Sequence, residues 1–175
     1  MKSKASVVVV VLLSSVALWA GYTKWERSHL GVVSSGGLCF ALGGGWQQDR
    51  NTPESGLYPA RFVSQSGVVR VILLPPELGD LQTAAAGLQQ TYNVDPRAVR
   101  NSFIHEPFVA ESSLSGVHVS YRRLVEAKGH LVETECHDYL VRNHAGRFVA
   151  INYQTSAHWD SINMDRMIRN TLRLQ

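Results

Sequence analysis

The chain has 175 residues, with 17 Lys and Arg against 14 Asp and Glu, so its formal net charge is +3 at pH 7. Without Lys2 and Lys4, which stand before the first apolar segment, the balance is 15 against 14. Because there is no run of like charges and no basic stripe interleaved with aromatic residues, the composition argues against nucleic acid as a partner. The roughly 150 residues after that segment suit a single domain with its own core.

Residues 1–23 have the pattern of a membrane or export segment. The uncharged run 5–22 has 18 residues. As a helix it would span roughly 27 Å, close to the roughly 30 Å hydrocarbon core of a bilayer. The best small-residue match for a signal peptidase, 15–17, lies inside this run, while Trp19, Tyr22 and Trp25 lie where an aromatic belt would meet the far headgroups. The flanks favour an uncleaved anchor, and a cleaved signal is the alternative.

The next segments predict a tether and the first strands of a domain. Residues 24–37 are rich in Ser and Gly, the composition of a flexible tether, so the folded domain is expected to cover 38–175. Residues 38–42 form a short apolar run that ends at three glycines and a Trp, as a strand entering a turn does. The runs 58–64 and 68–74 flank a Gly-containing turn and predict a hairpin.

A helix, a meander and a second helix are expected after this hairpin. Apolar residues recur at helical spacing over 81–92. Compact turn signals then separate four segments of two-residue period, namely 103–114, 117–127, 130–142 and 147–153. The last helix is predicted to begin near Ser156 and to continue to about Leu172, with arginines toward its C-terminal end.

This order of elements resembles the PsbP-like superfamily, which includes PsbP itself, Mog and DcrB-type exported domains. The residues that carry the resemblance are 38–42 with Trp46, the run 116–142 followed by 146–153, and the closing segment 159–174. The resemblance implies an α+β domain in which an antiparallel sheet of about six or seven strands has helices packed on it. It also implies a role in binding or assembly without catalysis.

The sequence offers no catalytic signature, so we expect no enzyme and no cofactor. There is no Gly-x-Ser-x-Gly elbow, phosphate loop or dinucleotide fingerprint. The densest ionisable cluster gives four weak candidates for a metal site: His130, Glu133, Glu135 and His137. On a strand the last three would share one face and could bind a metal with His118 or His130. The preferred interpretation is a solvated sheet face without a metal.

The two cysteines leave a further alternative open. An exported domain lies in an oxidising compartment, and the even count permits one bridge between Cys39 and Cys136. Two buried thiols are the other interpretation of the same pair.

These observations predict an accessory or assembly subunit of the bacterial inner membrane. A single-pass anchor would hold its C-terminal domain in the periplasm, where the domain would bind a membrane complex or another polypeptide; cleavage would instead leave a soluble periplasmic protein. Because partners dock on loops of a rigid sheet, the expected contact residues are Gly43, Gly44, Gly45, Trp46, Lys128 and Gly129. The alternative function is a periplasmic module that binds a small ligand or a metal.

Overall fold

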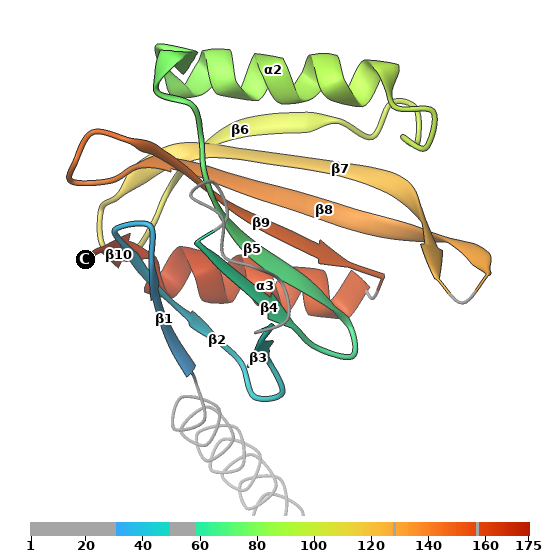
Figure 1. The fold of residues 1–175 in the computed structure, drawn as a ribbon, viewed down its shortest axis with the longest axis horizontal. Coiled ribbons are helices and arrows are strands. Elements are labelled where there is room, and N and C mark those ends of the chain that lie inside the picture. The colour runs from blue at the N-terminus through green and yellow to red at the C-terminus, as the bar shows by residue number, and fades with distance from the viewer. Residues whose placement is uncertain (1–30, 50–58, 128, 157) are drawn as a thin grey trace, which may run out of the picture.

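The structure, a computed structural model, describes residues 31–49, 59–127, 129–156 and 158–175 (Figure 1). The predicted anchor or signal segment at 1–23 and Lys128 lie outside these ranges. Among the described residues, no helix has the length and apolar character needed to cross a membrane.

The larger sheet is antiparallel and has the strand order β3–β4–β5–β9–β8–β7–β6. Its strands are β3 (Gln47–Gln48), β4 (Ala60–Val63), β5 (Gly67–Leu73), β6 (Ile104–Val109), β7 (Ser115–Ala127), β8 (His130–Arg142) and β9 (Phe148–Thr155). The meander predicted from the two-residue period is therefore confirmed as β6 to β9. β9 also pairs with β5, which joins the meander to the β4–β5 hairpin in one sheet.

The smaller sheet was not expected, and it corrects the 31–37 part of the predicted tether at 24–37; residues 24–30 lie outside the described ranges. β1 (Gly31–Ser35) pairs with β2 (Leu38–Leu42), and β10 (Arg173–Leu174) pairs with the other edge of β2. Gly36 and Gly37 form the two-residue turn between β1 and β2 with φ of 63° and 77°. Both central residues of a type I′ turn need positive φ, which glycine adopts without strain. The two glycines thus close a hairpin, and the folded domain includes residues before 38.

Helix α2 (Leu81–Val94) covers one face of the larger sheet (Figure 1). It follows a 3-10 turn, η1 (Pro76–Leu78), and begins at Asp80, whose carboxylate accepts a hydrogen bond from the Thr83 backbone N at 2.7 Å. Ala84 and Ala85 are buried against β7 and β8. This is the helix that the apolar spacing over 81–92 predicts.

Helix α3 (His158–Thr171) lies on the opposite face of the sheet, together with the smaller sheet (Figure 1). Its Met164 and Ile168 are buried, as is Leu172 just after it. These side chains join Phe40 of β2 and Ile151 of β9 in the main core. The molecule therefore has three layers, namely α2, the larger sheet, and α3 beside the smaller sheet.

Candidate functional site

The loop after β2 carries Gly43, Gly44, Gly45 and Trp46, four of the predicted contact residues. Gly45 has φ of 91°, a conformation that side-chain-bearing residues rarely adopt. Trp46 is half-buried and packs edge-on against Tyr153, with ring centroids 6.0 Å apart. Trp46 therefore anchors this loop to the core, and the glycines form its outer part.

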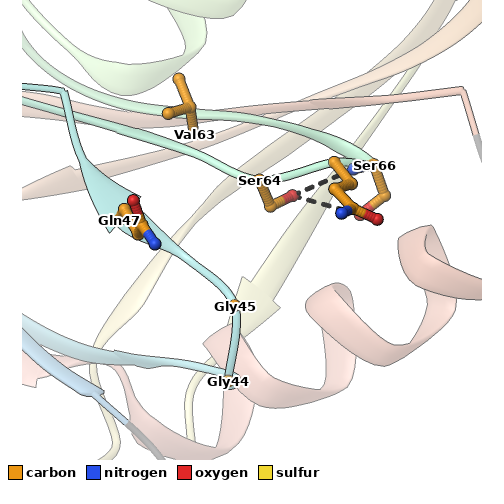
Figure 2. Close-up of a pocket in the computed structure, with 7 residues that line it drawn as sticks. Gly44, Gly45, Gln47, Val63, Ser64 and Ser66 are labelled. Atoms are coloured by element: carbon orange, nitrogen blue, oxygen red, sulfur yellow. Dashed lines mark hydrogen bonds between the residues drawn. The ribbon is translucent and has the colours of Figure 1, made fainter.

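A hollow of about 570 Å³ separates this loop from the β4–β5 hairpin (Figure 2). The hairpin side is fixed by Ser64, whose hydroxyl accepts hydrogen bonds from the backbone N of Ser66 and of Gly67, each at 3.2 Å. Its lining is uncharged: Gly44, Gly45, Gln47, Val63, Ser64, Gln65 and Ser66. Such a lining offers neutral hydrogen-bonding groups and no charge to attract an ion.

The second predicted contact region, at Gly129, lies at the tip of the longest hairpin. β6 pairs with β7 only as far as Ser120, and β9 pairs with β8 only as far as Glu135. The backbone at 97–99 covers a further part of the β7 edge, through hydrogen bonds with Arg122 and Leu124. Residues 125–127 and 129–132, which we call the β7–β8 arm, extend beyond these neighbours (Figure 1).

The candidate metal residues do not converge. His130 is exposed at the β7–β8 arm, and Glu133 pairs with Arg122 at 2.7 Å. Glu135 and His137 lie close, with Oε2 and Nε2 3.8 Å apart, and His118, the further ligand considered, has its Nε2 3.0 Å from His137 Nδ1. In the described residues no group of three or more His, Cys, Asp or Glu is arranged to hold a metal ion. The expectation that these residues lie on a solvated face is wrong for His137. Helix α3 covers this part of the sheet and leaves the His137 side chain 13% exposed.

Cys39 and Cys136 are buried free thiols, so the bridge left open by the sequence is not formed. They belong to different sheets: Cys39 lies in β2 with its sulfur 3.0 Å from the Ser34 hydroxyl, and Cys136 lies in β8. Burial, with the nearby Asp138 carboxylate, raises the pKa of the Cys136 thiol to about 12. A thiol that stays protonated is a poor nucleophile.

The structure brings together a chain of polar side chains, of which the sequence indicated only that His118 could lie beside His137. Glu106 Oε1 lies 3.3 Å from His118 Nδ1, His118 Nε2 lies 3.0 Å from His137 Nδ1, and His137 Nε2 lies 2.8 Å from the Ser161 hydroxyl. These four residues, which we call the polar chain, come from β6, β7, β8 and α3. They connect three strands to one helix, and only the Glu106 end of the chain is well exposed, at 52% of its side chain.

Three more side chains from β8 and α3 enclose this chain. Tyr139 stacks on His118 with ring centroids 4.7 Å apart, and its hydroxyl donates to Asp165 Oδ1 at 2.8 Å. Arg169 donates from Nε to the same oxygen at 2.8 Å and from Nη2 to Glu106 Oε1 at 3.0 Å. Ser161, Asp165 and Arg169 recur every four residues, so they lie along one side of α3. This spacing of polar residues beside Met164 and Ile168 was the sequence signal for the α3 side of the cluster.

Burial controls the charge state of both imidazoles. It lowers the pKa of His137 to about 4, helped by repulsion from His118, although Glu135 acts in the opposite direction. Burial also lowers the pKa of His118, although the Glu106 carboxylate, as a hydrogen-bond acceptor, favours the protonated ring. Burial alone would raise the pKa of Asp165, but hydrogen bonds from Arg169 and Tyr139 hold it below its ordinary value. At neutral pH the cluster thus combines two neutral rings with ionised Asp165 and Arg169.

A separate buried carboxylate lies on the α2 face of the sheet. Asp138 Oδ1 accepts a hydrogen bond from Asn152 Nδ2 at 2.8 Å, and Arg70 donates to Asn152 Oδ1 at 3.1 Å. Oδ2 of Asp138 has no hydrogen-bond partner among the described residues. Burial raises the pKa of Asp138 to about 6, against the hydrogen bond from Asn152.

The architecture matches a solved structure. Cyanobacterial PsbP (CyanoP) from Synechocystis sp. PCC 6803 superposes with a TM-score of 0.56 over 84% of this chain and 93% of that protein, at 15% sequence identity. The chain has a PsbP-like fold. No protein-family model matches the sequence, and no curated protein matches it.

Within this PsbP-like fold, the polar chain is arranged for structure more than for chemistry on a substrate. Ser161 is 3% exposed, so a substrate could not reach its hydroxyl. A nucleophile needs both a base and access to the reacting atom. The accessible features are instead the hollow beside Gly44 and the β7–β8 arm.

Proposed function

We propose that this chain is a non-enzymatic accessory or assembly subunit that binds a partner polypeptide or membrane complex through its PsbP-like domain. In this proposal, residues 1–23 anchor the chain in a bacterial inner membrane and the domain lies in the periplasm. The fold shared with CyanoP supports a binding role. The observation that carries the proposal is the β7–β8 arm.

The β7–β8 arm has the features of a docking element. It is a two-stranded ribbon held by cross-strand pairing, and no other strand among the described residues pairs with it. Leu131 on the arm is 61% exposed, which costs free energy in water that burial against a partner would recover. An unpaired strand edge can also pair with an extended segment of another chain. The arm therefore offers an apolar contact and backbone hydrogen bonds at one place.

Two ion pairs cross-link the base of the arm, which favours binding. Arg122 and Glu133 pair across the two strands at 2.7 Å, and Arg123 pairs with Asp95 at 3.1 Å. A surface that is ordered before binding loses less conformational entropy when the complex forms.

We expect Leu131→Glu to weaken partner binding by at least about 5-fold, because losing an apolar contact that anchors the centre of an interface costs about 1 kcal/mol or more. The measurement is quantitative recovery of partner polypeptides after gentle detergent extraction of the full-length protein. Val109→Glu is the matched control, since Val109 is 64% exposed in β6 and pairs with Ser115, at the opposite end of β7 from the arm. Equal recovery with Leu131→Glu and wild type would contradict docking at the arm. A partner-free monomer that retains a stoichiometric metal or small molecule would favour the ligand-binding alternative.

Membrane anchoring has its own test. If residues 1–23 stay attached, the intact mass of protein purified from membranes includes Lys2, with or without Met1. The reason is the poor position of the small-residue match at 15–17, inside the apolar run. A mature chain beginning near Leu18 would show cleavage and leave a soluble periplasmic subunit.

A further inference from the structure

The contact between α3 and the larger sheet has two different halves. Met164 and Ile168 are buried in the main core, whereas Ser161, Asp165 and Arg169 form hydrogen bonds with side chains of the strands. The apolar half does not depend on pH. The polar half contains two imidazoles, whose ordinary pKa lies near neutrality.

The hydrogen bond between His118 and His137 requires a defined proton count. One ring nitrogen must donate and the other must accept across the 3.0 Å contact, so the bond cannot form when both rings are protonated. The rings are also nearly parallel, with centroids 5.2 Å apart. Two positive charges at that distance would repel each other strongly because water is largely excluded.

A first proton is also opposed by a fixed cation. Arg169 Nη2 lies 3.1 Å from His118 Nδ1. A guanidinium only donates, so this contact needs an unprotonated Nδ1, whereas the 3.3 Å contact of Nδ1 with the Glu106 carboxylate needs a proton there. In the first arrangement His118 donates from Nε2 to His137 Nδ1 and His137 donates from Nε2 to Ser161; in the second arrangement both directions reverse, so the neutral pair always has one donor and one acceptor across the 3.0 Å contact. Protonation of Nδ1 in the first arrangement would set an N–H against the guanidinium and leave the Glu106 carboxylate as its acceptor.

We propose that the His118–His137 pair is an acid-sensitive latch: it holds α3 on the larger sheet at neutral pH and releases α3 when the rings take up protons. Release breaks the bond to Ser161 and separates Asp165 from Tyr139. Release also removes the contact of Met167 with the loop: the Met167 Cε lies 3.4 Å from the place that a Cβ atom would occupy at Gly43. Acid would therefore change the loop at 43–46 as well as α3.

The groups around the pair identify the imidazoles as the ones whose proton uptake on release falls between pH 5 and 7. The ionisable groups facing the two rings are Glu106 on β6, Glu135 and Tyr139 on β8, Tyr153 on β9, and Asp165 and Arg169 on α3. The pKa values of Glu106 and Asp165 are lowered, those of Tyr139 and Tyr153 are raised, and Arg169 stays charged. Glu135, 3.8 Å from His137, stabilises the protonated ring, but burial of the ring outweighs this effect.

Asp138 titrates in the same range but lies on the other face of the sheet, beside Asn152. Release of α3 leaves that face covered by α2. A measurement of α3 alone therefore separates the latch from the titration of Asp138, which a global unfolding measurement would not do.

The test is hydrogen exchange of the full-length chain in detergent at pH 7 and pH 5, corrected for intrinsic exchange rates and followed in peptides from α3 and α2. A ring whose pKa rises from about 4 to its ordinary 6.5 on release makes opening about 20-fold more favourable at pH 5 than at pH 7. We expect amide protection in α3 to fall by about that factor while protection in α2 is retained. Unchanged protection of α3 in the wild type would overturn the proposal, as would an equal loss in α2 and α3.

Two variants then assign the effect to the pair. His118→Gln with His137→Gln removes both titrating rings and should abolish the difference between the two pH values. His144→Gln is the matched control, because His144 is exposed in the turn between β8 and β9 and should leave the wild-type response unchanged. A double variant that keeps the full response would overturn the proposal. If that variant does not fold, the comparison of α3 with α2 in the wild type still decides the outcome.

Discussion

Phe40→Ala should lower the free energy of unfolding by about 3–5 kcal/mol, the usual cost of removing a buried aromatic side chain. Phe40 is 1% exposed in β2, and it belongs to the same core as Ile151 of the larger sheet and Ile168 of α3. Its loss would leave a cavity where three elements meet. Since domains of this size are stable by roughly 5–15 kcal/mol, the variant should lose a large part of its stability. Denaturant unfolding of the full-length chain, followed by tryptophan fluorescence, measures the change.

Val32→Ala is the comparison for this prediction. Val32 lies on the neighbouring strand β1 but is 67% exposed, so its truncation should cost less than about 1 kcal/mol. A cost for Phe40→Ala as small as this would show that β2 does not pack in the main core as the structure has it.

The elements with strong periodicity were predictable from the sequence. The meander was read from alternating residues and compact turns, and α2 from apolar residues at helical spacing. Both signals are local, because they report how each element meets the core. Four residues were expected in the core: Phe148, Ile151 and Ile168 are buried, whereas Trp46 is half-buried. Strand ends were predicted less well: β6 ends at Val109 instead of 114, because the chain turns at Ser113 with φ of 67°.

The smaller sheet was not predictable in the same way. β1 and β10 each gain their structure from pairing with β2, and Arg173 pairs with Cys39 across most of the sequence. Local composition does not indicate a pairing between strands so far apart in the sequence. Gly36 and Gly37 also have two interpretations, since the same residues occur in flexible tethers and in tight hairpins. The pairing partner decides between them.

The polar chain as a whole was missed because the sequence does not say which sheet face a helix covers. Alternation places Glu135 and His137 on one face. That face would be exposed to solvent if α3 did not cover it, and it is buried because α3 does. His118 and His137 meet only through the register of β7 and β8, in which Ser120 lies opposite His137. The hairpin signal predicts the pairing of these strands, but α3 gives the pair its buried environment.

The second prediction with a large expected effect on stability concerns Asp138. Its carboxyl is buried, and the raised pKa, about 6 against an ordinary 3.8, means that folding disfavours the ionised form. A group whose pKa is raised by folding contributes stability at low pH and loses it as the pH rises through the folded value. The loss here begins near pH 4 and is complete above pH 6. By pH 7.5 the ionised carboxylate costs about 3 kcal/mol, since each pKa unit corresponds to about 1.4 kcal/mol.

Asp138→Asn should therefore raise the free energy of unfolding by up to about 3 kcal/mol at pH 7.5, and by about 2 kcal/mol less at pH 4.5, where the wild-type carboxyl is largely protonated in the fold. The amide oxygen can still accept the hydrogen bond from Asn152, and no charge is left in the core. Denaturant unfolding at both pH values measures the difference, with Glu126→Gln, an exposed carboxylate, as the control that should change stability by less than about 0.5 kcal/mol. The opposite result, destabilisation of similar size at both pH values, would mean that Asp138 is ionised and well paired, with Arg70 as the nearest cation to supply the charge.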